Sequence, residues 1–319
     1  MTSIIAEIFH KVQKIVNYYE EERKTYTAIM YMLVSGLFFI LSGTFIKKIT
    51  NVSSMQIFCL RSVCSFLINS SVIAVKGDQN IYTKDREAYG LLLKRVLFGF
   101  IADYFFVAML KYLTLGDCTS IVMTYPIFST ILASIILKEH FSKYLIYSII
   151  FCVIGIILVC KPPFILNYFF DSYSHSQSPN IFLGFLNGLG FVTFLSFSIV
   201  TTRRLGGKVT IQVLLQYLYF CTIFASTLFI MSSGDEIGSY VTLNNIFMII
   251  GTGFSQNCAN IFYNKSLFLE KATVVIPLSY TQVIFSFLSD VFIFKVAPNI
   301  FSIVGCLFIV SGSYLTLKQ

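Results

Sequence analysis

The sequence predicts an all-α polytopic membrane protein whose ten transmembrane helices form two inverted five-helix repeats. Three observations predict this class: the composition, the number of long apolar stretches and a weak internal similarity. Of the 319 residues, 56% are hydrophobic and 12% are charged, whereas soluble domains carry about 25% charged residues. The mean hydropathy is +0.79. This composition argues against a water-soluble enzyme and predicts a protein that lies in a lipid bilayer.

Ten apolar stretches of about 17 to 23 residues are each long enough to cross a bilayer as a helix. They are residues 28–46, 55–75, 90–110, 118–137, 144–160, 181–202, 209–231, 244–263, 273–294 and 299–317. Backbone polar groups in lipid must be satisfied within the chain, and these stretches are too long and continuous for barrel strands. We therefore expect helices and almost no strand.

A short hydrophilic segment precedes the first stretch. Residues 1–25 are predicted to be a cytoplasmic tail. Within it, apolar residues from Ile4 to Tyr19 recur at helical spacing, with Lys and Glu on the other face. This pattern fits either a helix lying on the membrane surface or a frayed tail.

Internal similarity at a nearly constant offset divides the ten stretches five and five. A shift of 156 places residues 47–57 on 203–213, and a shift of 154 places 99–103 on 253–257. The sequence thus predicts a first repeat over 26–161, a linker over 162–180 and a second repeat over 181–319. Because five is odd, the second repeat should enter the membrane upside down relative to the first.

The distribution of basic residues predicts the orientation. The net charge is +8, and Lys and Arg occur singly or in pairs between apolar stretches, which gives no basis for a nucleic-acid partner. Of the 23 Lys and Arg, 17 lie in the termini and even-numbered connections, 5 in odd-numbered connections, and Arg61 lies inside a stretch. Both termini are therefore predicted to be cytoplasmic. The sequence distinguishes neither the plasma membrane nor an endomembrane such as the Golgi or ER.

Neither a metal nor a cofactor is predicted. The eight cysteines fall within or at the end of apolar stretches, without a CxxC pair or a neighbouring histidine, and are best explained as buried hydrophobes. Three histidines form no ligand cluster, and the GxxxxGK[ST] loop that binds ATP is missing.

Charged residues inside membrane spans cost at least about 2.5 kcal/mol each at the helix centre, so each needs a pore, a partner or a function. Arg61, Asp103 and Asp290 are the clearest cases. Arg61 either binds an anionic group of a substrate or pairs permanently with Asp103. Asp103 is either a proton-coupling acid or a hydrogen-bonded buried acid. Asp290, late in its span, is assigned to a gate or an interface.

The eighth stretch carries one polar helical face. Asn257, Asn260 and Asn264 occur at i, i+3 and i+7, beside Gln256. This face points either to a water-filled cavity or to neighbouring helices. Asn257 also occupies the position that Asp103 holds in the first repeat, which suggests that both positions face a shared cavity.

Two prolines interrupt apolar stretches in corresponding places. Pro126 follows Tyr125, and Pro277 precedes Tyr280 and Gln282. The carbonyl groups that these prolines free could line a binding site or permit a hinge, and the alternative is a kink that only aids packing.

Small residues recur seven apart in the fifth and tenth stretches. They are Ser148 and Gly155 in one, and Gly305 and Gly312 in the other. Such spacing favours close helix packing. The contact could lie within one chain or between the subunits of a homodimer.

Three segments resemble the drug/metabolite transporter superfamily, specifically its EamA-type carriers with two five-helix repeats. They are residues 57–66, which include Arg61, residues 112–142, which include Pro126 and end near Glu139, and residues 267–298. In the last segment Lys295 and Val296 stand where the family often has Gly-Glu. The resemblance covers about residues 26–317 and implies gating roles for Pro126, Pro277 and Glu139. Related carriers move amino acids, nucleotide sugars, organic anions and drugs.

These observations favour a secondary transporter of a small polar metabolite that works by alternating access, either proton-coupled or by exchange. The predicted cavity residues are Arg61, Asp103, Tyr125, Gln256, Asn257, Asn260, Tyr280 and Gln282. An intramembrane enzyme would need a convergent nucleophile, base or metal set, which the spans do not offer, so no enzyme is predicted. The remaining alternative is a membrane scaffold or receptor that transports nothing.

Overall fold

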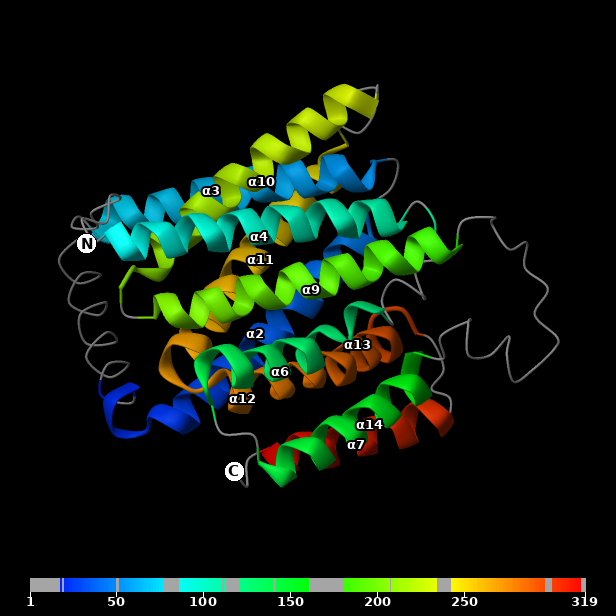
Figure 1. The fold of residues 1–319 in the computed structure, drawn as a ribbon. Coiled ribbons are helices and arrows are strands. Elements are labelled where there is room, and N and C mark those ends of the chain that lie inside the picture. Colours follow the sequence, from blue (N-terminus) through cyan, green and yellow to red (C-terminus); the bar gives the residue numbers. More distant parts are fainter. Residues whose placement is uncertain are drawn as a thin grey trace, which may run out of the picture.

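The computed structural model describes residues 18, 20–49, 52–76, 86–110, 112, 121–139, 142–160, 181–206, 208–233, 242–295 and 300–316. The regular elements in these ranges are all helical, and each of the ten predicted stretches contains at least one (Figure 1). They are α2 (Lys24–Lys47), α3 (Ser54–Lys76), α4 (Arg86–Leu110), α6 (Tyr125–Leu137), α7 (Lys143–Cys160), α9 (Ile181–Leu205), α10 (Ile211–Ser233), α11 (Leu243–Leu269), α12 (Ala272–Val275), η1 (Ile276–Tyr280), α13 (Thr281–Phe292) and α14 (Ile300–Thr316).

Four helices in the described part of the chain are long and apolar enough to cross a membrane: Lys24–Lys47, Met55–Val75, Phe182–Leu205 and Ile211–Ser232. Shorter apolar helices accompany them. The predicted all-helical membrane class is confirmed, whereas the count of ten spanning helices stays a prediction. The surface helix predicted before residue 18 and the linker 162–180 lie outside the described residues.

The bundle is apolar outside and partly polar inside. Large apolar side chains such as Phe182, Phe247 and Phe292 are about three-quarters exposed on its outer faces. Amide side chains such as those of Asn69 and Asn257 are buried between helices. This arrangement suits a lipid environment, in which a polar group is cheaper inside the bundle than on its surface.

Helices of the first half of the chain pack in pairs with helices of the second half. α4 packs along α9 and α2 packs along α11, while α3 packs on α10, α6 on η1 and α7 on α14 (Figure 1). Suppose that the first helix of one half corresponds to the first helix of the other, and so on along the chain. Exchanging the halves then turns the α4–α9 pair into the α11–α2 pair and leaves each of the other three pairs unchanged. Every long helix of the first half is therefore packed against the second half.

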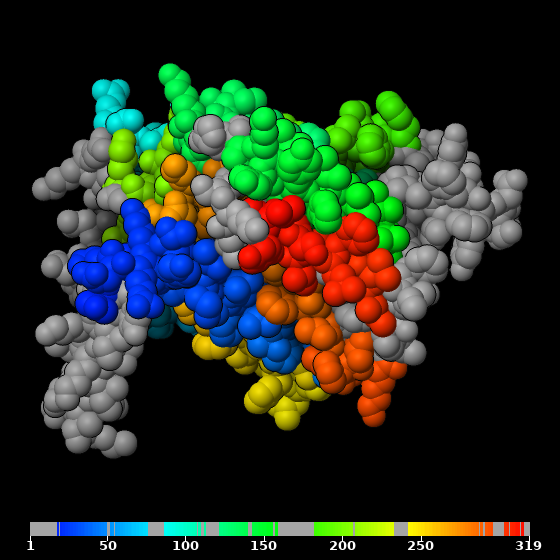
Figure 2. Space-filling model, turned by 90° about the horizontal axis from the view of Figure 1, so that it is seen from below, coloured from blue at the N-terminus to red at the C-terminus, as the bar shows by residue number. Residues whose placement is uncertain are grey.

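A seam of small residues joins α7 to α14, which lie side by side in Figure 2. A Cβ atom on Gly155 would lie 2.6 Å from the backbone oxygen of Gly305, and one on Gly312 would lie 2.9 Å from that of Ser148. Close packing through the small residues thus occurs within one chain. Because these residues are buried in the seam, a homodimer would need another surface, and the homodimer itself stays a prediction.

The fourth and ninth stretches are broken near their prolines rather than continuous. Residues 123–124 form a turn, and α6 begins at Tyr125 with Pro126 in its first turn, where a missing N–H costs nothing. Pro277 lies near the start of the 3-10 segment η1, which joins α12 to α13. Lys138 and Lys295, which end these two stretches, both have left-handed φ values, 53° and 54°.

Candidate functional site

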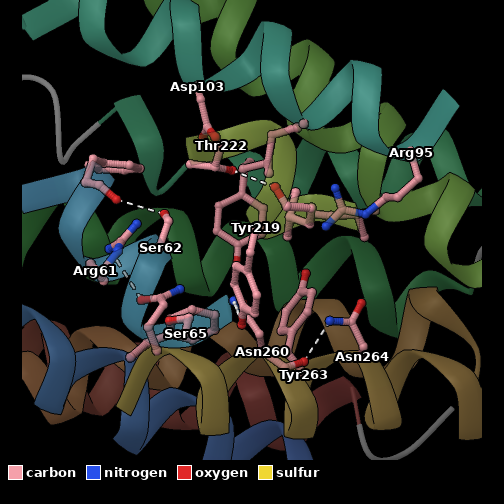
Figure 3. Close-up of a pocket in the computed structure, with 18 of the residues that line it drawn as sticks. Arg61, Ser62, Ser65, Arg95, Asp103, Tyr219, Thr222, Asn260, Tyr263 and Asn264 are labelled. Atoms are coloured by element: carbon pink, nitrogen blue, oxygen red, sulfur yellow. Dashed lines mark hydrogen bonds between the residues drawn. The ribbon is translucent and has the colours of Figure 1, made fainter. Parts of the chain in front are cut away.

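A cavity of about 380 Å³ lies between helices of both halves of the chain. It is lined by Phe39, Ile40, Phe58, Arg61, Ser62, Ser65, Arg95, Gly99, Asp103, Tyr125, Leu195, Ile199, Leu218, Tyr219, Thr222, Gln256, Asn260, Tyr263, Asn264 and Gln282. Figure 3 shows that polar side chains from several helices meet here. Six of the eight predicted cavity residues are in this lining, all except Asn257 and Tyr280.

Arg61 enters the cavity from α3, and no carboxylate of the described residues lies within 4.0 Å of its guanidinium group. Its Nη1 atom donates to Gln256 Oε1 over a long 3.5 Å, and its Nε atom is buried without a hydrogen-bond partner among the described residues. The guanidinium carbon lies 4.1 Å from the centre of the Phe58 ring. The guanidinium group therefore packs on the Phe58 ring, with its Nε donor unpaired among the described residues.

Asp103, on α4, faces the same cavity. Of the ion pairs within 4.0 Å in the described part of the chain, none joins it to Arg61. The permanent Arg61–Asp103 pair considered from the sequence is therefore not formed in this structure.

Arg95 is a cavity residue that sequence reasoning missed. Although Arg95 lies within the predicted stretch 90–110, its charge was counted with the connection before that stretch. In the structure α4 begins at Arg86, and Arg95 precedes Asp103 by about two turns. Its Nε atom donates to Thr202 Oγ1 at 2.6 Å, and a second donor bonds the Ser198 hydroxyl on α9. The reasoning that singled out Arg61 as a charge inside a membrane span could have found Arg95 as well, because the stretch 90–110 includes it.

The polar face predicted on α11 points toward α10 and the cavity. Tyr219 of α10 donates to Asn257 Oδ1 at 3.0 Å and accepts from Asn260 Nδ2 at 3.1 Å. Asn260 lines the cavity, while Asn257 lies behind Tyr219 and is 2% exposed. The sequence could not indicate Tyr219, because one tyrosine among 19 carries no periodic signal.

The cavity lining does not include Tyr280, Pro126 or Pro277. Tyr280 is fully buried and packs in an apolar cluster with Cys152, Val283 and Ile309, so its side chain does not line the site. Pro126 and Pro277 stand at the helix breaks described above. Asp290 lies on α13, and its side chain is outside the described part of the structure.

Four buried polar atoms of the lining have no hydrogen-bond partner within the described residues. They are Arg61 Nε, Tyr263 Oη, Asn264 Oδ1 and Gln282 Nε2. Buried polar groups are nearly always paired in proteins, because an unpaired group costs about 1–3 kcal/mol. Four of the nine such atoms among the described residues belong to side chains of this lining. No group of three or more His, Cys, Asp or Glu in the described residues could hold a metal ion.

The contacts of Glu139 and Arg203 link four helices, α6, α9, α11 and α12, at one end of the bundle. Its carboxylate accepts from the backbone N–H groups of Ala272 at 3.1 Å and Thr273 at 2.8 Å, where α12 begins. Arg203, at the end of α9, places its Nε atom 3.7 Å from the carboxylate. Arg203 also donates to the backbone oxygen of Phe268, near the end of α11, at 2.9 Å. We call this group of contacts the Glu139 knot.

Further ionic contacts lie at the same end of the bundle. Lys208 pairs with Glu87 at 2.8 Å, and Lys265 pairs with Glu20 at 2.5 Å. We name this end, where α2, α4, α10 and α12 begin, the basic end.

Replacing Glu139 by glutamine should lower the apparent Tm by several degrees. The amide keeps one acceptor for two backbone N–H groups and removes the charge that faces Arg203, which should cost about 1–3 kcal/mol. Thermal unfolding in detergent measures this. Glu87→Gln is the matched control, because the Glu87 side chain is 73% exposed and its pair with Lys208 should contribute about 1 kcal/mol or less. Equal Tm values for the two variants would contradict the structural role of the knot.

Comparison with known proteins now connects this geometry to a family. The EamA-like transporter family matches residues 26–161. Solute carrier family 35 member G1 of Homo sapiens is 26% identical over 285 residues, 89% of this chain and 77% of its own length. The first half of the chain is therefore similar to EamA-like transporters. The superfamily resemblance recognised from the sequence is thereby confirmed.

A second sequence relative and a solved structure are also similar to this chain. An uncharacterized transporter of Helicobacter pylori is 22% identical over 291 residues, 90% of this chain and 93% of its own. A crystal structure covers 91% of the EamA-type chain and 96% of its own chain at a TM-score of 0.77 and 14% identity, which shows a shared fold. The EamA-type protein is accordingly a multi-pass membrane transporter, whose family moves small molecules across a bilayer.

Proposed function

We propose that the protein is a secondary carrier that moves a small polar metabolite by alternating access through the cavity between its halves. The observation that carries this proposal is the set of four unpaired buried polar groups around one cavity. They come from α3, α11 and α13, so both halves of the chain supply them. A scaffold that binds no ligand would leave these groups unpaired in every state, at a cost in stability.

The proposed halves are the five-helix repeats 26–161 and 181–319, joined by the linker 162–180. The exchange of helix partners between the halves supports this division, because an inverted two-fold relation produces pairs of that kind. The left-handed ends at Lys138 and Lys295, 157 residues apart, fit the same offset as the small-residue seam. In such carriers one repeat rocks against the other around a fixed midplane site.

The proposed orientation places both termini in the cytoplasm. The basic end would then face the cytoplasm, as the excess of Lys and Arg there favours. The Glu139 knot would be the gate at that face, since it joins α6 to α9, α11 and α12. Pro126 and Pro277, which stand next to the helix breaks, would be the hinges, and Asp290 belongs to the proposed gating set on the basis of its sequence alone.

Uptake into proteoliposomes tests the carrier. Purified protein is reconstituted and given a pooled panel of amino acids, nucleotide sugars and organic anions, with and without a pH gradient. We expect saturable uptake of at least one compound. Gradient-driven accumulation that Asp103→Asn abolishes would support proton coupling through Asp103, whereas gradient-independent exchange that survives would support exchange. Glu87→Gln, an exposed acid on the same helix, is the control and should leave uptake unchanged. No flux of any compound would contradict the carrier and favour a scaffold or receptor.

A further inference from the structure

We propose that an open groove between α2 and α13 is a binding site for an anionic phospholipid. One acyl chain of the lipid would lie in the groove. Its phosphate would lie against Lys47, Lys48 and Lys295 at the end of the groove. This lipid site is separate from the polar cavity, and binding of the lipid requires no transport through that cavity.

The groove is apolar and lies at the surface of the bundle. It has a volume of about 260 Å³, and seven of its nine lining residues are apolar. They include Leu37, Ile40 and Leu41 on α2 and Phe285, Leu288 and Phe292 on α13. The two helices lie side by side on the face that Figure 2 shows. An apolar cavity of about 150 Å³ binds benzene, so this groove has room for a longer stretch of hydrocarbon.

The polar groups of the groove are satisfied by the protein itself. The hydroxyl groups of Thr44 and Ser289 bond each other at 2.9 Å, and Thr44 also donates to the backbone oxygen of Ile40 at 2.8 Å. None of the lining residues holds one of the unpaired buried polar atoms found in the described part of the chain. The polar cavity, in contrast, holds four of them. The cavity therefore suits a polar solute, whereas the groove suits a hydrocarbon chain.

The groove runs along the two helices toward their carboxyl ends. Thr44 contacts Ser289, and further along both helices the Nζ atom of Lys47 lies 4.1 Å from the centre of the Phe294 ring. The two helices therefore run in the same direction and end at the same level. From Leu37 to Thr44 the groove follows about 10 Å of helix. An extended acyl chain can lie along this path and lead to the lysines.

Basic residues are concentrated where the groove ends. α2 ends at Lys47, Lys48 follows it, and Lys295 follows Phe294. All three lysine residues are exposed. They are three of the five Lys and Arg in the odd-numbered connections of the chain. Lysines at a membrane surface attract anionic lipids, and their long stems let the ammonium groups reach the level of the headgroups.

The charge of this end matches one phosphodiester. The carboxyl ends of two helices together carry about one negative charge, and Asp290 on α13 contributes another. Against the three lysines this leaves a net charge of about +1. A phospholipid whose only charge is its phosphodiester neutralises that charge. A zwitterionic lipid such as phosphatidylcholine brings its own cation and gains less from the lysines.

The lipid site shares a wall with the polar cavity. Ile40 lines both of them. A bound acyl chain would fill the outer side of this wall and brace α2 against α13. Because a ligand that binds only the folded protein stabilises it, the lipid should raise the apparent Tm.

Titration of delipidated protein in a nonionic detergent tests the site. Phosphatidylglycerol and phosphatidylcholine are added separately, native mass spectrometry counts the retained lipids, and thermal unfolding measures Tm. We expect one tightly held phosphatidylglycerol per chain and a rise in Tm of several degrees. Its half-saturating concentration should be about 100-fold lower than that of phosphatidylcholine, because each lysine contributes a factor of about five. Glycerol 3-phosphate, which has no acyl chain, should leave Tm unchanged.

Variants of the lysines test the headgroup site. The triple variant Lys47→Gln/Lys48→Gln/Lys295→Gln should lose the preference for phosphatidylglycerol over phosphatidylcholine. Its control removes the same charge from three exposed lysines on other parts of the surface: Lys24→Gln/Lys94→Gln/Lys143→Gln. The control variant should keep the preference of the wild type.

A second pair of variants tests the groove. Leu41→Trp fills the groove from α2 and should weaken retention of phosphatidylglycerol at least about tenfold, since the acyl chain loses its place. Leu67→Trp is the matched control, because Leu67 is an exposed leucine on α3 that does not line the groove.

Each contrary result overturns a stated part of the site. Equal binding of the two lipids, or a preference that both triple variants keep or both lose, would overturn the headgroup site. Unchanged lipid retention by Leu41→Trp would overturn the groove. Equal stabilisation by glycerol 3-phosphate would assign the lysines to a soluble phosphate, and a dimer that Leu41→Trp dissociates would assign the groove to a second copy of the chain. None of these measurements uses flux, so absence of transport would contradict the carrier and leave the lipid site standing.

Discussion

Uptake by the Arg61→Gln variant is expected to fall about 10- to 100-fold. Hydrogen bonds to a charged group contribute about 1.5–3 kcal/mol, and each 1.4 kcal/mol is a factor of ten in affinity. Arg61 offers a free edge to the cavity, whereas Arg95 is engaged with α9. The loss should appear in proteoliposome uptake of any transported compound that carries a negative group.

The thermal stability of Arg61→Gln should not fall together with its uptake. An unpaired buried charge costs free energy, so removing it should leave the apparent Tm unchanged or raise it slightly. Arg86→Gln makes the same chemical change at an exposed position of α4 and should alter neither uptake nor Tm. Arg61→Lys keeps the charge and loses the fork, so its uptake should lie between those of the wild type and Arg61→Gln. Full uptake by Arg61→Gln would exclude Arg61 from the binding site.

The double variant Gly155→Ala/Gly312→Ala is expected to lower the apparent Tm by several degrees. Each new Cβ atom would lie under 3.0 Å from backbone of the facing helix, so α7 and α14 must separate. Overpacking of this kind costs about 1–3 kcal/mol per site. Thermal unfolding in detergent measures the effect.

Gly43→Ala supplies the matched control for the seam. A Cβ atom on Gly43 meets nothing within 4 Å, and alanine is about 0.5–1 kcal/mol better than glycine inside a helix. Its Tm should therefore stay level or rise. If the double variant matched Gly43→Ala in Tm, the close approach of α7 and α14 would not contribute to stability.

Much of the fold could be predicted because a lipid bilayer limits the secondary structures that can span it. Long apolar stretches must be helical, and the helices of the structure fall where those stretches were placed. The boundaries were harder. Apolar periodicity cannot separate a helix interior from its polar first turn, so the start of α4 at Arg86 was misplaced. The interruption expected at Pro126 lies just before it, at residues 123–124, because proline is tolerated in the first turn of a helix.

Residues of the candidate site could be predicted where a charged or amide side chain stands inside an apolar stretch. Charges and amides inside apolar stretches led directly to Arg61, Asp103, Gln256 and Asn260, all of which line the cavity. Tyr263 and Tyr219 could not be found that way, because tyrosine is ordinary in a membrane span. Tyr280 was predicted to line the cavity but lies in an apolar cluster. It ends the 3-10 segment that contains Pro277, and the apolar pattern of the sequence does not indicate which way side chains point after such a change of helix type.

The seam between α7 and α14 can form only late in the synthesis of the chain. Gly155 meets Gly305, 150 residues further along the chain, so α7 cannot gain its close partner until the second half has been made. At about 5–20 residues per second, that wait lasts roughly 8–30 s. During this interval the backbone-exposing faces of Gly155 and Ser148 are available to other proteins in the membrane. Premature termination after α13 would leave the same faces of α7 without their partner.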